Sequence, residues 1–162
     1  MRTSVLAVVL AAVLITVGCA ASAYIEPTGV DTATLRIENQ GPAIFGYELE
    51  AETYGDGTAC SGRLRLAAAR ALPRGVAHSV HVAADADFTL TLRGSGGGPS
   101  RTDSCALAGT FRPGAGERYL AIFRVDERRC ELLFLRQQAV PGGARRYLPE
   151  ASYRPRHEPA CR

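Results

Sequence analysis

The stretch CALAGTFRPGAGERYLAIF, residues 105–123, decides how this chain is expected to fold. Two apolar runs flank a Pro-Gly-Ala-Gly corner that begins at Pro113 and ends at Gly116. The proline ring fixes its own φ at the end of one strand, and the glycines adopt turn conformations that other residues avoid. The segment therefore predicts a β-hairpin whose return strand begins close to Tyr119.

Tyr119 follows this corner in a position that resembles the tyrosine corner of immunoglobulin- and fibronectin-like sandwiches. In such a corner the ring packs and the hydroxyl bonds a nearby backbone group. We therefore predict that Pro113, Gly116 and Tyr119 form a structural corner and not a ligand site.

Short runs in which apolar and polar residues alternate lie on both sides of this hairpin. Alternation with a period of two predicts strands with one solvated face. The expected strands are 32–38, 45–53, 78–84, 87–93, 104–112, 117–125 and 130–137. The last two are apolar on both faces in places, which puts them in the middle of a sheet. Residues 63–73 fit a strand or a short Ala-rich helix equally well.

Short strands joined by turns predict an all-β fold, a single antiparallel β-sandwich of the immunoglobulin-like kind over residues 32–137. Within it, GSGGGPS at residues 94–100 predicts a flexible loop, because it offers no side chains to pack. After it, residues 138–162 contain four prolines and no periodicity. They predict an extended Arg- and Pro-rich tail that is pinned near its end by Cys161.

Residues 1–18 have the composition of an export signal. Arg2 precedes an apolar run over residues 4–17. This run is shorter than the roughly 18–20 residues that a permanent transmembrane helix needs. The sequence therefore predicts a signal peptide and not a retained anchor helix.

Two processing sites compete after this run. Gly18-Cys19 resembles a bacterial lipobox, in which Cys19 is diacylated and becomes the mature N-terminus, while an A-x-A pattern ends at Ala23. A cysteine in a discarded signal would have no role, so we predict lipidation of Cys19, with residues 19–31 as a flexible tether. The alternative is a soluble secreted β-domain that begins at Tyr24.

The other four cysteines predict two disulfides, as is typical of a small exported domain. They are Cys60, Cys105, Cys130 and Cys161. Their spacing leaves all the possible connectivities open, and we favour Cys60–Cys105 with Cys130–Cys161. In a simple meander Cys105 and Cys130 would lie two strands apart, roughly 10 Å, which is too far to bridge.

All 19 basic residues are arginine, and the excess of positive charge lies near the C-terminus. Residues 24–136 carry 13 Arg and 14 Asp or Glu, a net charge of −1, and residues 137–162 carry 5 Arg and 2 Glu, a net charge of +3. A nucleic-acid-binding surface usually needs a basic stripe with interleaved aromatic residues. We therefore predict no nucleic-acid partner.

The residues that could carry chemistry have simpler structural explanations. His78 and His81 lie three apart on an expected strand, so they point to opposite faces and cannot share a metal ion. GSGGG at 94–98 lacks the offset of a nucleophile elbow and the ending of a phosphate-binding loop. The remaining carboxylates are expected on solvated strand faces; they are Asp85, Asp87, Glu48, Glu50 and Glu52. We predict no catalytic residue, metal site, cofactor or small-molecule substrate.

Several stretches together resemble a group of small lipoproteins of Gram-negative bacteria with an immunoglobulin- or transthyretin-like sandwich domain. They are GC (18–19), YIEPTGVDTATLRI (24–37), ACSG (59–62), SCALAGTFRPGAGERY (104–119) and RRCELLF (128–134). The resemblance implies a β-sandwich in the cell envelope and no known activity. It suggests the periplasmic face of the outer membrane, with which Ala20 after the acylated Cys19 is compatible.

The function expected from these features is a non-enzymatic binding or accessory module, held to the membrane by its N-terminal lipid and able to contact an envelope protein. A periplasmic inhibitor of a hydrolase is the alternative from a different class. An inhibitor of a basic lysozyme should be acidic, so that charge steers the two proteins together. The sequence pI of about 8.7 argues against that target.

Overall fold

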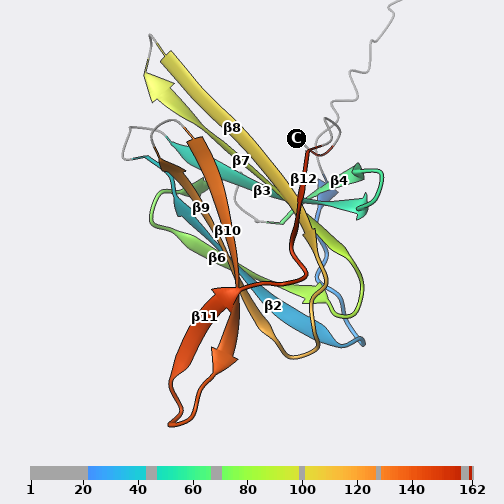
Figure 1. Cartoon of the computed structure of the whole chain (residues 1–162). Coiled ribbons are helices and arrows are strands. Elements are labelled where there is room, and N and C mark those ends of the chain that lie inside the picture. Colours follow the sequence, from blue (N-terminus) through green and yellow to red (C-terminus); the bar gives the residue numbers. More distant parts are fainter. Residues whose placement is uncertain are drawn as a thin grey trace, which may run out of the picture.

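The computed structural model describes residues 22–42, 47–66, 71–98, 101–126, 129–157 and 161, and in these ranges every regular element is a strand. Twelve strands form two sheets that pack face to face (Figure 1). The prediction of an all-β sandwich is confirmed.

The two sheets hold seven and five strands. In spatial order the first consists of β1 (Ser22–Ala23), β4 (Ser61–Arg65), β3 (Glu48–Asp56), β7 (Phe88–Gly98), β8 (Arg101–Phe111) and β12 (Arg154–Arg156), with β5 (Leu72–Pro73) paired to β3. The second consists of β11 (Arg145–Pro149), β10 (Arg129–Ala139), β9 (Arg118–Asp126), β2 (Thr32–Gln40) and β6 (Ala77–Ala83). We call one side of the sandwich the N-terminal edge (β1, β4, β6 and residues 24–31) and the other the C-terminal edge (β11, β12 and residues 150–153).

Two of the strand pairs are parallel. β9 runs parallel to β2, with Leu35 opposite Tyr119, and β1 runs parallel to β4. The prediction of a wholly antiparallel sandwich is wrong for these pairs. The chain passes through the seven-stranded sheet between β6 and β9, so β9 can return beside β2 in the same direction. Both β9 and β10 have neighbours on each side, as their apolar sequences predict.

The core lies between the sheets and follows the alternation of the sequence. Every second residue of β2 is buried from Ala33 to Asn39, and the other strands contribute in the same way. The largest fully buried apolar side chains are Phe111, Phe123, Leu35, Ile37, Leu49, Leu90, Leu92, Val80 and Val82. Burial of each such side chain contributes roughly 1.5–3 kcal/mol, so this two-sided layer is the main source of stability.

The glycine run that predicted a loop belongs instead to β7, which continues to Gly98 and pairs with β8. Gly94 and Gly96 lie against the ring of Tyr47, and a Cβ atom at Gly94 would overlap the Tyr47 hydroxyl and the Phe123 ring. A strand glycine marks a place where another group approaches the backbone closely. Here the missing side chains make room for two aromatic rings of the core.

The C-terminal residues are also not a simple extended tail. β11 forms a hairpin with β10, turning through Gly142 and Gly143, which adopt positive φ values of 90° and 79°. β12 then pairs with β8 at the edge of the other sheet. These strands are five and three residues long, which is too short for alternation to be visible in the sequence. The sandwich therefore extends well beyond residue 137.

The described part of residues 63–73 contains strands and no helix. β4 ends at Arg65 and β5 begins at Leu72. The Ala-rich residues 67–70, on which the helical alternative depended, lie outside the described residues.

Candidate functional site

The N-terminal edge is formed by the first residues of the described chain. Ser22 and Ala23 pair with Leu64 and Arg65 of β4, and the Tyr24 amide donates to the carbonyl oxygen of Arg65 at 2.8 Å. Residues 22–24 of the predicted tether over 19–31 are therefore attached to the seven-stranded sheet. A two-residue strand has no sequence pattern, which is why its pairing was not foreseen. The predicted signal peptide and Cys19 lie outside the described residues.

Tyr24 joins the two sheets at this edge. Its hydroxyl donates to the carbonyl oxygen of His81 on β6 at 3.2 Å, and its ring meets the ring of Phe88 on β7 edge-on, with centroids 6.2 Å apart. Burial, with a smaller contribution from Glu26, raises the pKa of Tyr24. Tyr24 thus closes the gap between β4 and β6 without a covalent bond.

The two histidines of β6 have separate partners. His81 Nδ1 lies 2.7 Å from a carboxylate oxygen of Glu26, and His78 Nε2 lies 3.1 Å from the carbonyl oxygen of Leu66. Within the described part of the chain, no group of three or more His, Cys, Asp or Glu side chains could hold a metal ion. The Glu26–His81 contact instead fastens residues 24–31 to the five-stranded sheet.

The four predicted cysteines form two disulfides, but the favoured pairing is wrong. Cys105 of β8 is bonded to Cys130 of β10, with Cα atoms 6.3 Å apart, and Cys60 is bonded to Cys161. The distance argument against Cys105–Cys130 assumed that both strands lie in one sheet. β8 and β10 belong to opposite sheets, so these cysteines face each other across the core.

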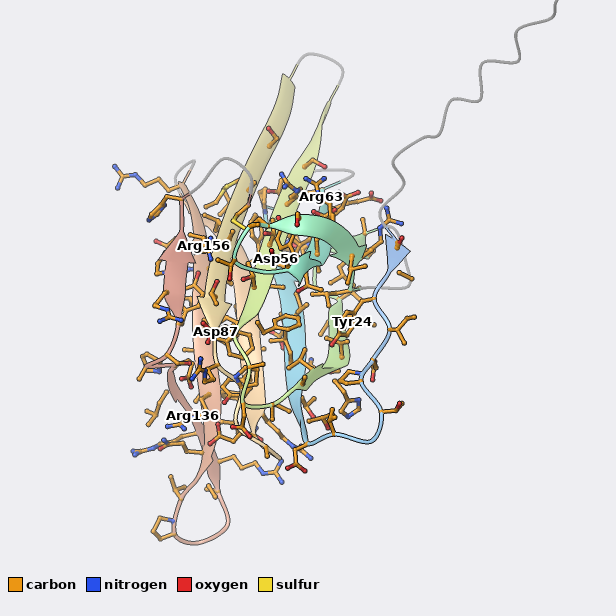
Figure 2. The ribbon with its side chains drawn as sticks, turned by 90° about the vertical axis from the view of Figure 1, so that its right-hand side faces the viewer. Tyr24, Asp56, Arg63, Asp87, Arg136 and Arg156 are labelled. Atoms are coloured by element: carbon orange, nitrogen blue, oxygen red, sulfur yellow. A yellow bond between two sulfur atoms is a disulfide. The ribbon has the colours of Figure 1, made fainter. Side chains whose placement is uncertain are left out.

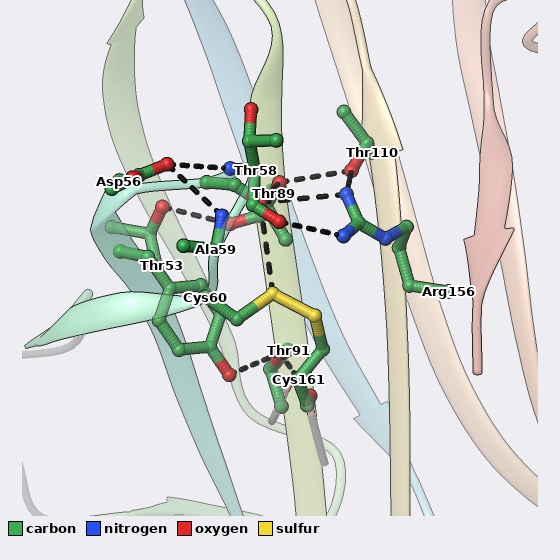
Figure 3. The surroundings of a disulfide bond; sticks show 12 residues. Thr53, Asp56, Thr58, Ala59, Cys60, Thr89, Thr91, Thr110, Arg156 and Cys161 are labelled. Atoms are coloured by element: carbon green, nitrogen blue, oxygen red, sulfur yellow. Dashed lines mark hydrogen bonds between the residues drawn. A yellow bond between two sulfur atoms is a disulfide. The ribbon is translucent and has the colours of Figure 1, made fainter. Parts of the chain in front are cut away.

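The Cys60–Cys161 disulfide lies on the outer face of the seven-stranded sheet (Figure 3). The Asp56 carboxylate accepts hydrogen bonds from the amides of Thr58 and Ala59, which shapes the turn that leads to Cys60. Cys60 has a φ of 51°, and Cys161 is fully buried. Together with Tyr54 and Ala108 the two cysteines form a second, small apolar cluster. Cys161 therefore covers part of the outer face of this sheet.

A polar layer surrounds this disulfide. Tyr54 and Thr91 share a hydrogen bond of 3.0 Å, and the Thr91 hydroxyl donates to the carbonyl oxygen of Cys161 at 2.9 Å. The Thr89 hydroxyl bonds Thr110 at 2.9 Å and donates to the carbonyl oxygen of Gly57 at 3.1 Å. These buried hydroxyls hold the strands, the turn and the C-terminus together.

A cleft of about 460 Å³ opens beside this layer. Arg156 donates to the carbonyl oxygen of Thr58 at 2.9 Å, and Asp87 accepts from Arg154 at 3.0 Å and from Arg112 at 2.9 Å. Two guanidinium groups, those of Arg112 and Arg154, therefore hold the Asp87 carboxylate, while Arg156 binds the turn. Arg154 and Arg156 line the cleft together with Asp87, and guanidinium groups are the side chains that recognise carboxylates and phosphates. The sequence indicated an excess of arginine here but not this arrangement.

Tyr119 lies at the start of β9 with its ring buried. Its hydroxyl accepts a hydrogen bond from the amide of Gly114 at 2.9 Å and donates to the carboxylate of Glu117. The ring packs on Phe111, with centroids 5.0 Å apart, and burial raises the pKa of Tyr119. Gly116 has a positive φ of 71°, and Pro113 is buried. These are the packing and backbone contacts of a structural corner.

An ion network that the sequence did not reveal connects this corner to the C-terminal edge. Arg136 lies 3.1 Å from an oxygen of Glu117 and 3.5 Å from an oxygen of Glu150, whose side chain is buried. Beyond Glu150, the ring of Tyr153 stacks on Phe134 with centroids 5.1 Å apart. A Cβ atom at Gly109 would overlap this ring. Residues 150–153 thus bridge the sheets opposite the N-terminal edge.

The glutamates of β3 do not all lie on a solvated face. Glu48 is exposed as predicted, but the Glu52 side chain is only 5% exposed and lies 3.1 Å from Arg93 and 3.4 Å from Arg63. The two arginines come from β7 and β4, which flank β3. Glu52 therefore serves as a buried structural ion-pair partner.

No protein-family model matches the chain, and no curated protein matches it. Within the described ranges there is no helix long and apolar enough to cross a membrane. The resemblance to envelope lipoproteins stays a prediction.

Proposed function

We propose that the chain is a non-enzymatic lipoprotein of the cell envelope, anchored through Cys19 at the periplasmic face of the outer membrane, where its sandwich acts as a binding or accessory module. The observation that carries this proposal is β1. Only Ala20 and Ala21 separate Cys19 from the first strand, whose two residues pair with β4.

The two processing sites have different consequences for this strand. Cleavage before Cys19 keeps β1 and its pairing intact. Cleavage after Ala23 removes β1 and turns the Tyr24 amide, which donates to Arg65, into a charged terminal amine. Because the second cut discards residues that complete a sheet edge, the structure favours the cut that leaves Cys19 as the acylated N-terminus.

The two disulfides support export of the folded domain, since such bonds persist in oxidising compartments. The guanidinium-lined cleft lies at the C-terminal edge, away from β1. An anchored domain would therefore present this cleft to the periplasm, where it is suited to an acidic partner.

The proposal is tested by acyl labelling and membrane fractionation of three proteins. The wild type should carry the acyl label and sediment with membranes, and Cys19→Ser should lose both properties. Ala23→Arg is the matched control, because it blocks a cut that needs a small residue at that position but leaves Cys19 intact; it should behave as wild type. A soluble wild-type protein that begins at Tyr24 would contradict the proposal.

A further inference from the structure

The two most exposed large apolar side chains among the described residues lie on the N-terminal edge. Ile25 is 86% exposed and Val30 is 59% exposed. Both belong to the segment between β1 and β2. Tyr24 and Glu26 of the same segment attach it to β6. An isolated exposed aliphatic residue is ordinary on a protein surface, but these two project from a docked segment that begins a few residues after the proposed anchor.

Chain length limits where the acylated residue can lie. Three residue steps separate Cys19 from Ser22, and an extended chain spans at most about 3.6 Å per residue, or about 11 Å in total. β1 is the outermost strand of the seven-stranded sheet. The lipid must therefore emerge at the N-terminal edge, and the bilayer surface must come within about the same distance of β1.

The shape of the molecule puts Ile25 and Val30 on the side from which the lipid emerges. Figure 2 shows β1 and the segment that contains Tyr24 along one side of the molecule, with Arg136 and Arg156 on the opposite side. On the N-terminal side, the Glu26 carboxylate lies 2.7 Å from His81 Nδ1, which holds this segment on β6. Ser22 and Ala23 are small and exposed.

We propose that the N-terminal edge lies flat on the bilayer surface, with Ile25 and Val30 inserted at the boundary between headgroups and acyl chains. This inference rests on the proposed lipid anchor at Cys19. Interfacial binding grows with the apolar area that enters the boundary region, and it adds to the anchoring by a covalent lipid. The orientation directs the C-terminal edge away from the membrane.

The experiment uses the absence of tryptophan from the chain. Single-tryptophan reporters I25W, V30W and Y147W are made in the full-length protein, purified with the lipid attached and placed in vesicles of phosphatidylethanolamine and phosphatidylglycerol. Y147W is the matched control, because Tyr147 is 43% exposed on β11 at the other edge. Fluorescence is recorded with and without brominated lipid as a quencher, and mass spectrometry of the same samples establishes the acyl group.

In the acylated protein we expect I25W and V30W to show blue-shifted emission and to lose most of their intensity to the brominated lipid, while Y147W keeps its aqueous emission. If I25W and V30W stay unquenched in acylated protein, the inference is overturned and the proposed function survives. Quenching of I25W without V30W also overturns it, because the edge would not lie flat. Equal quenching of Y147W also overturns it, because the protein would then have no preferred orientation on the bilayer. Absence of the acyl group overturns the proposed function and the inference together.

Discussion

The two edges of the sandwich solve the same structural problem by different means. At each edge a short segment must bridge the seven- and five-stranded sheets and cover the core between them. The N-terminal edge uses one tyrosine, Tyr24, and one contact between the Glu26 carboxylate and the His81 ring. The C-terminal edge uses the stacked ring of Tyr153 and an ion network in which the Glu150 side chain is buried, next to the disulfide that joins β8 to β10 and the one that pins Cys161.

The difference reflects what each segment offers for burial. The residues of β11 and β12 are exposed or half-buried, and most of them are arginine or proline. They bring little apolar surface, so hydrophobic burial alone cannot offset the entropy of ordering them, which is about 1–2 kcal/mol per residue for the backbone. Covalent closure reduces that cost by restricting the unfolded chain. The N-terminal segment is short, and under the proposed function the membrane would hold its other end.

The largest effect is expected from the disulfide that fastens the C-terminal edge. Cys60–Cys161 spans 101 residues and Cys105–Cys130 spans 25. Chain-entropy arguments predict that C60A/C161A loses about 4–5 kcal/mol of unfolding free energy and C105A/C130A about 3–4 kcal/mol. Urea unfolding at matched protein concentration measures both.

Trypsin digestion distinguishes local loosening of the C-terminal strands from a loss of stability of the whole domain. C60A/C161A should be cut rapidly at the arginines of β11 and β12, which the disulfide holds on the sandwich, while C105A/C130A should resist longer there. Equal resistance in both variants would show that the C-terminal strands hold without Cys161, and the comparison between the edges would fail.

The sequence predicted the sandwich because most of its strands are long enough to alternate. Its failures concern features that depend on distant parts of the chain. The disulfide pairing depends on which sheet each strand joins, and strand spacing carries no information about that. The glycines of β7 suggested a loop because they offer no side chains to pack. Their role, to make room for Tyr47, is visible only in the folded structure.

The candidate site was less predictable for the same reason. Lipidation of Cys19 stays a prediction from its local motif, while β1, two residues long, has no pattern, and neither do the short strands β11 and β12. The ion pairs of Arg136 and of Asp87 join residues far apart in the sequence. The sequence showed an excess of arginine near the C-terminus. It did not show which carboxylates pair with these arginines.

Tyr119 sharpens the comparison, because its corner is connected through Glu117 and Arg136 to the C-terminal edge. Tyr119→Ala removes a buried ring and should cost about 3–4 kcal/mol, while Tyr119→Phe removes only the hydroxyl and should cost about 1 kcal/mol. Urea midpoints of the three proteins measure this. An unchanged midpoint in the alanine variant would refute the structural role.

The bridging tyrosines test the edges directly. Tyr153→Ala removes a half-buried ring that stacks on Phe134, and we expect a loss of about 2–3 kcal/mol. Tyr24→Ala removes a ring in an edge-on contact and one hydrogen bond to a backbone carbonyl, and we expect about 1–2 kcal/mol in detergent-free solution. Thermal unfolding of both variants ranks them, and a larger loss for Tyr24→Ala would reverse the comparison.

The smallest effect is expected from alkaline pH. Burial raises the pKa of Tyr153 to about 12 from its ordinary value of 10.0. In the unfolded chain the phenol ionises near pH 10, so between pH 10 and 12 the unfolded state binds fewer protons than the folded state. The contribution of this group to stability is therefore complete below pH 10 and is lost as the pH rises through the folded pKa.

The variant Tyr153→Phe removes this titration, so its stability should fall less than that of wild type between about pH 9 and about pH 11. Tyr24→Phe is the matched control from the N-terminal edge, where the pKa is raised less strongly, and its pH profile should stay closer to that of wild type. Urea midpoints at each pH measure the difference, with non-reducing mass spectrometry to establish that both disulfides remain intact. Parallel profiles for wild type and Tyr153→Phe would mean that the Tyr153 hydroxyl is hydrated in the folded protein and that residues 150–153 close the C-terminal edge less tightly than the stacked ring suggests.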